Sequence, residues 1–154
     1  MYTMQQLLDR QEIVDLSYRY AHFGATRRIA DRVLLFTEDC EFNYTSSDNS
    51  GRGREALGTF LKKTGGQWEA YHLYLTNHLI TFDANDSNCA AGMLYLFGWY
   101  RPVGAKDSSA DVHKYSEYHD EYRKTASGWL IAKRTAKRIG SSVGGGKVLP
   151  DAGK

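Results

Sequence analysis

Four long strand-like segments fill the second half of the chain and constrain its fold more than any other feature. They are rich in β-branched and aromatic residues and cover residues 72–82, 90–100, 112–124 and 129–139. Turn-forming runs separate them, such as Asp83-Ala84-Asn85-Asp86 and Ser127-Gly128. Strands of this kind in immediate succession predict a mostly antiparallel sheet.

Helical patterns precede these strands. Thr3 and Gln6 have the spacing of a capping box, and apolar residues recur on one helical face as far as Gly24. Four shorter elements are expected next: helices at 29–36 and 54–63, a strand at 39–44 and a polar loop at 46–53. Three helices packed on one face of a run of long strands predict an α+β fold.

The chain is expected to form one domain followed by a tail. Its 154 residues suffice for a single domain that buries about 70% of the surface of the unfolded chain. No internal repeat or linker divides it. We expect the domain to cover residues 1–139 and the glycine-rich residues 140–154 to form a mobile tail.

Charge and composition exclude several classes of function. The net charge is only +2, and the basic cluster of Lys133, Arg134, Lys137 and Arg138 is typical of a solvated terminal strand rather than of a nucleic-acid site. The two cysteines give no disulfide framework, and neither they nor the histidines have metal-ligand spacing. No signal peptide or membrane span is recognisable. We therefore expect a cytoplasmic protein without a metal, a cofactor, or a nucleic-acid or membrane partner.

Aromatic residues are abundant enough to suggest a ligand cavity. The 11 Tyr, 6 Phe and 3 Trp residues exceed what a core of this size needs. Tyrosine suits a cavity wall because it combines an apolar ring with a polar tip. The candidates for an apolar pocket are Phe36, Tyr44, Tyr74, Tyr95, Phe97 and Trp99. The alternative is that these rings only form the core.

Several short motifs together carry a family resemblance. They are Arg19-Tyr20-Ala21, Phe36-Thr37-Glu38-Asp39-Cys40, Thr76-Asn77-His78 and Tyr118-His119-Asp120-Glu121-Tyr122. In order and spacing they resemble the SnoaL-like branch of the NTF2-like superfamily, over roughly residues 8–139. The resemblance implies a cone-shaped α+β barrel, with three N-terminal helices packed on a curved sheet. Many members are cofactor-free dehydratases, isomerases or cyclases.

The resemblance also implies roles for three residues. Tyr20 is expected to point into the cone and to bind or polarise a substrate oxygen, as a neutral phenol can. Arg138 matches an arginine near the pocket of a bile-acid dehydratase, where it could stabilise an enolate or anchor a carboxylate or phenolate. Asn77 matches a common polar position of the family and could form a hydrogen bond with the substrate. The alternatives are that Tyr20 is an aromatic residue of the core, that Arg138 is a solvated cation and that Asn77 is a structural residue at a strand edge.

The acid–histidine pair of the family's dehydratases is not recognisable. Ala25 occupies the position of the aspartate, and Leu73 that of the histidine, with His72 one residue earlier. A one-residue shift turns a strand side chain to the other face, so His72 reaches the pocket only if the strand carries a bulge. His72 and His78 share strand parity and could line one surface as proton shuttles. Structural roles for both histidines are the alternative.

The leading hypothesis is therefore a cofactor-independent lyase, isomerase or cyclase that acts by proton transfer on a hydrophobic or aromatic small molecule. Phenols, polyketides and steroid-like compounds fit this description. One alternative is a non-catalytic small-molecule-binding or assembly module. Another is the small structural subunit of a ring-hydroxylating dioxygenase. A homodimer or homotrimer is expected in the first case.

Overall fold

The computed structural model describes residues 1–44 and 49–144. Its helices are α1 (Met4–Ala25), α2 (Ile29–Val33) and α3 (Arg54–Gly65). Its strands are β1 (Phe36–Tyr44), β2 (Ser50–Arg52), β3 (Trp68–Phe82), β4 (Cys89–Pro102), β5 (Val112–Thr125) and β6 (Gly128–Val143). A short 3₁₀ turn, Ser108–Ala110, lies between β4 and β5.

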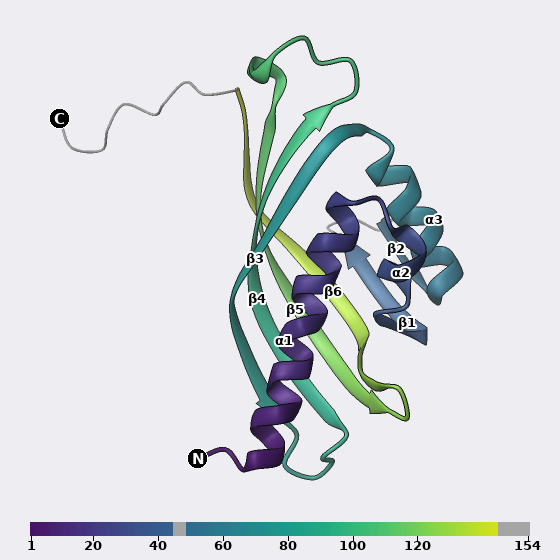
Figure 1. Cartoon of the computed structure of the whole chain (residues 1–154), viewed down its shortest axis with the longest axis vertical. Helices are drawn as coiled ribbons and strands as arrows, with labels where there is room; N and C mark the ends of the chain where they lie inside the picture. The colour runs from purple at the N-terminus through teal and green to yellow at the C-terminus, as the bar shows by residue number, and fades with distance from the viewer. Residues whose placement is uncertain (45–48, 145–154) are drawn as a thin grey trace, which may run out of the picture.

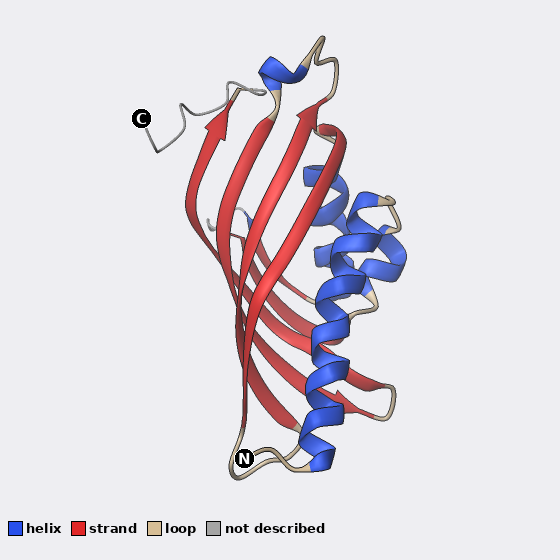
Figure 2. Ribbon diagram, turned by 60° about the vertical axis from the view of Figure 1, so that its left-hand side comes forward, coloured by secondary structure: helices blue, strands red, loops and turns tan. Residues whose placement is uncertain are grey.

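The strands form one curved sheet in the order β2-β1-β6-β5-β4-β3. Only β1 and β6 run parallel among the described strand pairs, and the other neighbours are antiparallel. The helices all lie on one side of the sheet, with α1 along its length (Figures 1 and 2). This arrangement confirms the predicted α+β class with a curved, mostly antiparallel sheet.

The first helix begins and ends where local chemistry dictates. The Thr3 hydroxyl accepts from the backbone N–H of Gln6 at 3.1 Å, and the Gln6 side chain accepts from the N–H of Thr3 at 3.0 Å, which confirms the capping box. Just after the helix, Arg27 has a φ of 62°, in the left-handed region. Its guanidinium donates to the carbonyls of Gly65, Trp68 and Glu69, and so ties the end of α1 to the α3–β3 turn.

Several boundaries differ from those predicted, most clearly at α2, β2 and β6. The α2 helix ends at Val33, because β1 starts at Phe36 and pairs there with Ile131 of β6. Residues 50–52, predicted as part of a polar loop, form β2 by pairing with β1. The last strand continues to Val143, which pairs with Val112, so the sheet extends past the predicted end at Ile139. The rest of the predicted mobile tail lies outside the described residues.

Apolar side chains fill one half of the space between helices and sheet. Ile13, Leu16, Leu94 and Ile131 are almost fully buried there, with Trp129 beside them. The other half, where α1 ends and α2 and α3 approach the sheet, contains the cavity described below. Over residues 1–44 and 49–144, no helix is both long and apolar enough to cross a membrane.

Candidate active site

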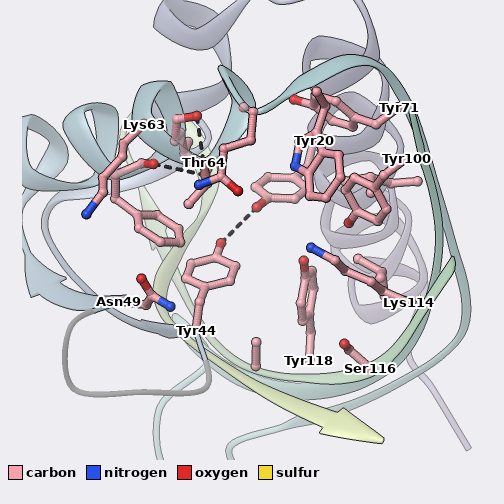
Figure 3. A pocket seen from close by; sticks show the side chains of 18 of the residues that line it. Tyr20, Tyr44, Asn49, Lys63, Thr64, Tyr71, Tyr100, Lys114, Ser116 and Tyr118 are labelled. Atoms are coloured by element: carbon pink, nitrogen blue, oxygen red, sulfur yellow. Dashed lines mark hydrogen bonds between the residues drawn. The ribbon is translucent and has the colours of Figure 1, made fainter. Parts of the chain in front are cut away.

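A cavity of about 480 Å³ lies between the end of α1, the helices α2 and α3, and strands β3 to β6 (Figure 3). Five tyrosines line it: Tyr20, Tyr44, Tyr71, Tyr100 and Tyr118. Four cations line it: Arg32, Lys63, Lys114 and Arg138. Apolar side chains complete much of the wall: Phe60, Leu61, Leu73, Leu96 and Ala136. None of the described lining residues is Asp, Glu or His.

Tyr20 and Tyr44 form a hydroxyl pair at the wall of this cavity. Their oxygens are 2.8 Å apart, as the dashed line in Figure 3 shows. Tyr20 comes from the buried face of α1 and is only 1% exposed. The guanidinium carbon of Arg32 lies 3.7 Å from the centroid of the Tyr20 ring, and that of Arg134 lies 4.4 Å from it. Tyr20 is therefore a buried phenol between two cations.

This environment separates the pKa values of the two tyrosines. Burial raises the pKa of Tyr20, but the charges of Arg32 and Arg134, with the Tyr44 hydrogen bond, bring it below the ordinary value. The pKa of Tyr44 is raised well above the ordinary value, first by burial and then by the proximity of Tyr20. Tyr44 thus keeps its proton and donates the hydrogen bond, and Tyr20 is the group that more readily releases one.

Arg32 reaches the cavity because residue 24 is a glycine. A Cβ at Gly24 would lie 3.0 Å from the Arg32 guanidinium carbon, so a larger residue in α1 would push that side chain away. Arg32 is 5% exposed, and its Nη1 donates to the Tyr71 hydroxyl at 3.3 Å. Its Nε has no hydrogen-bond partner in the described structure. No carboxylate pairs with this buried guanidinium among the described residues.

A second polar cluster lies deeper between α1 and the sheet. Arg134 and Asp120 form a two-point ion pair, with N–O distances of 2.8 and 2.6 Å. The Tyr122 hydroxyl donates to Asp120 at 2.8 Å, so it must accept from His78 Nε2 at 2.9 Å. His78 Nδ1 is then the acceptor for the Ser17 hydroxyl at 3.4 Å. Arg134 links this series of hydrogen bonds to the cavity, because its guanidinium also lies against Tyr20.

The buried His78 side chain should make the stability of the folded protein depend on pH. Burial lowers the pKa of His78 to about 4, whereas unfolded histidine titrates near 6.5. Between these values the unfolded chain binds a proton that the folded protein does not. Stability therefore falls as the pH drops through this window. In urea unfolding near pH 7 and near pH 5, His78→Gln should lose less free energy of unfolding between the two conditions than the wild-type protein.

His72→Gln is the matched control for this experiment, because His72 lies on the same strand but is exposed. Its free energy of unfolding should change between the two pH values by as much as that of the wild-type protein. An unchanged difference in His78→Gln would show that His78 is not the group responsible.

A bulge in β3 separates the two histidines that were expected to line one surface. The pairing with β4 shifts between Thr76 and Leu79, and Asn77 within it has a φ of 54°. Leu73 therefore lines the cavity and His72 is exposed on the other face, beside Trp99. After the bulge, His78 points inward. The interpretation that His72 and His78 line one surface is wrong, because the bulge lies between them, and neither is among the described residues that line the cavity.

The structure brings only some of the other predicted residues to the cavity. Tyr20, Tyr44 and Arg138 line it. Phe36 is fully buried in the core against Tyr20 instead. Three predicted residues have the strand parity opposite to that of Leu73 and Leu96 and so do not point into the cavity: Tyr74, Tyr95 and Trp99. Asn77 is exposed because it lies in the bulge. Trp99 donates to Asp111 rather than to a ligand.

Sequence reasoning missed Arg32 and Lys114. Lys114, Ser116 and Tyr118 are alternate residues of β5 and so point to the same face of the sheet. This alternation could have indicated that Lys114 points inward. No local signal distinguished Arg32 from the other charged residues of the second helix. Only the fold places it over Tyr20. No group of three or more His, Cys, Asp or Glu side chains suited to a metal ion occurs in residues 1–44 and 49–144.

Known structures share this architecture. A candidate scytalone dehydratase from Novosphingobium aromaticivorans has a TM-score of 0.80 at 20% identity, over 90% of this chain and 89% of the other. LinA-type3, a hexachlorocyclohexane dehydrochlorinase from Novosphingobium barchaimii, has a TM-score of 0.75 at 16% identity, over 90% of this chain and 91% of the other. The Kfla4162 protein from Kribbella flavida has a TM-score of 0.79 at 20% identity, over 89% of this chain and 95% of the other. At these identities the likeness shows a common fold.

The sequence itself identifies the family. No curated protein matches the chain in sequence. The SnoaL-like domain model, however, matches residues 5–135, from the first helix to the last strand. This range includes both the hydroxyl pair of Tyr20 and Tyr44 and the strands that form the cavity wall. The chain therefore belongs to the SnoaL-like domain family, with structural neighbours in the NTF2-like superfamily.

Proposed function

We propose that this protein is a cofactor-independent enzyme that transfers a proton on an apolar or aromatic small molecule, as a lyase, isomerase or cyclase. One observation carries the proposal. Tyr20, a buried phenol with a lowered pKa, faces a cavity of about 480 Å³ and has Tyr44 and Arg32 beside it. A pKa moved toward neutral pH is what a general acid–base group requires.

The chemistry assigned to this site begins with proton abstraction. The Tyr20 oxygen, as phenolate, takes a proton from a carbon next to a substrate carbonyl. The electron pair of the broken C–H bond moves to the carbonyl oxygen and gives an enolate. Arg32, which lines the cavity and lies against Tyr20, supplies positive charge to stabilise it. The enolate then either expels a leaving group from the neighbouring carbon or is protonated at another position.

The site differs from an acid–histidine pair in a way that supports this assignment. Leu73 lines the cavity where a histidine would stand, and Ala25 cannot hold or orient an imidazole. Near the end of α1, Tyr20 and Arg32 lie against each other in the cavity wall and supply the reactive and the charged group. Two of the structural neighbours are named for the loss of water and of hydrogen chloride. Both reactions are eliminations, which favours a lyase.

Hydrogen–deuterium exchange tests the proposal without knowledge of the full reaction. The protein is incubated in D₂O with 1-tetralone or 6-hydroxy-1-tetralone, which are aromatic ketones with an acidic C–H bond. Incorporation of deuterium next to the carbonyl, followed by NMR, should exceed the rate in buffer and with heat-denatured protein. Ketones that raise the melting temperature but exchange no faster than in buffer would contradict the proposal.

A binding module is the second candidate. The observation that favours it is the absence of Asp, Glu and His from the described lining of the cavity, because these side chains are common proton acceptors. A carrier would bind aromatic ketones or phenols tightly, release them unchanged and show no exchange. The experiment above therefore separates the two candidates.

We further propose a homodimer or homotrimer formed through the outer face of the sheet. Exposed aromatic rings cluster there: Tyr74, Tyr95, Phe97 and Tyr115. Phe97 lies at the centre, with ring centroids of Tyr74 at 5.8 Å and of Tyr115 at 5.4 Å. Exposed apolar clusters of this kind mark interaction surfaces.

Phe97→Asp should therefore convert the oligomer to a monomer in light scattering coupled to size exclusion. A charge at the centre of a buried aromatic contact is strongly unfavourable. Glu55→Ala, an exposed change on α3 and so on the other side of the sheet, is the control and should leave the mass unchanged. A wild-type protein that is already monomeric would contradict the proposal.

A further inference from the structure

Lys114 is a cation held inside the cavity by aromatic rings. It points inward from the start of β5 (Figure 3). Its ammonium lies 4.5 Å from the ring centroids of both Trp68 and Tyr100, which hold it by cation–π contacts. No carboxylate lies within ion-pair distance of it among the described residues. Lys124, further along the same strand, pairs instead with Asp9 at 2.7 Å.

A second cation shares this part of the wall. Arg138 of β6 also lines the cavity and is paired in the sheet with Ser116 of β5, two positions after Lys114. Burial lowers the pKa of Lys114, and the charge of Arg138 lowers it further, so the two cations repel each other. The described residues give neither side chain an acidic partner, although Arg101 and Arg134 both have one.

This distribution of charge is unfavourable unless a negative charge lies beside it. Like charges in a partly desolvated space repel each other, and each has lost some of its hydration. A bound anion removes both costs at once. The apolar and aromatic wall beside them, from Leu73, Leu96 and Tyr118, suits the remainder of such a molecule.

We infer that the cavity takes aromatic or alicyclic carboxylates, with Lys114 and Arg138 binding the carboxylate. This inference rests on the proposed function only in identifying the bound molecule as the substrate. The carboxylate fixes the position of the molecule through charge-assisted hydrogen bonds, and Tyr20 on the facing wall reaches its reactive carbon. Lys114 and Arg138 are then specificity-determining residues that do not themselves move protons.

Isothermal titration calorimetry with a matched pair of probes tests this. The probes are 6-hydroxy-2-naphthoate and 6-hydroxy-2-naphthamide, which have nearly the same shape and differ in charge. The carboxylate should bind the wild-type protein at least about tenfold more tightly than the amide. Lys114→Met should abolish most of this preference by weakening the carboxylate, with little change for the amide. Arg138→Met should reduce the preference less, because Arg138 is more exposed.

Lys137→Met is the control, since it removes the same charge from an exposed position next to Arg138. It should keep the wild-type preference. Binding of the amide by Lys114→Met also shows that this variant is folded. The inference is overturned if the two probes bind alike, if neither binds at about 1 mM, or if Lys114→Met keeps the preference. The naphthoate and the naphthamide have no C–H bond next to a ketone, so they test binding alone. Preferential binding of the carboxylate together with no deuterium exchange in the tetralones would contradict the proposed function and leave this inference standing.

Discussion

Tyr20→Phe should lower the rate of deuterium exchange, and of turnover once a substrate is known, by about 10²–10⁴. The variant removes one oxygen atom, which is the proposed proton acceptor, and keeps the ring between Arg32 and Arg134. Folding should change little, because the lost hydrogen bond to Tyr44 contributes only about 1 kcal/mol. The two measurements are the exchange rate by NMR and the melting temperature.

Two further variants separate proton transfer from general effects on the cavity. Tyr44→Phe removes the donor to Tyr20 and should raise the pH at which exchange reaches its plateau, because the Tyr20 phenolate loses a stabilising hydrogen bond. Tyr18→Phe changes an exposed tyrosine on α1 and should leave the rate at the wild-type value. A Tyr20→Phe rate within about threefold of wild type would remove Tyr20 from the mechanism.

The fold was predictable because its signals are local and repeated. The capping box of Thr3 and Gln6, the inward face of α1 and the four long strands each follow from short sequence patterns. The motifs around Tyr20 and Cys40 then singled out one family. The boundaries that moved depend on pairing with distant strands, as at Phe36 with Ile131 and at Val143 with Val112. Such pairing has no signature in the local sequence.

The site was predictable only in part, for one physical reason. Strand parity assigns side chains to faces, and a single bulge reverses the assignment. The bulge at Asn77 moved His78 inward relative to His72. On β4 the unbroken register puts Leu96 in the cavity and Tyr95 outside. Aromatic residues occur on both faces, so composition indicated a cavity but did not identify which rings line it.

Asp120→Asn should destabilise the protein by about 3–5 kcal/mol, which is the usual cost of leaving a buried charge unpaired. Arg134 is 0% exposed, and Asp120 is its only carboxylate partner among the described residues. Asparagine keeps the shape but removes the negative charge. For a chain of this size the melting temperature should fall by about 10 °C. Asp39→Asn, in the exposed pair with Arg123, is the control and should change stability little.

The double variant Asp120→Leu/Arg134→Met distinguishes the structural role of the ion pair from its effect on Tyr20. It replaces two buried charges with apolar groups of similar size and should recover most of the stability lost in Asp120→Asn. Tyr20 nevertheless loses one of the two guanidiniums that lower its pKa. Exchange should therefore shift to higher pH in a protein that is again stable. If stability and the pH profile recovered together, Arg134 would be structural and Arg32 alone would set the ionisation of Tyr20.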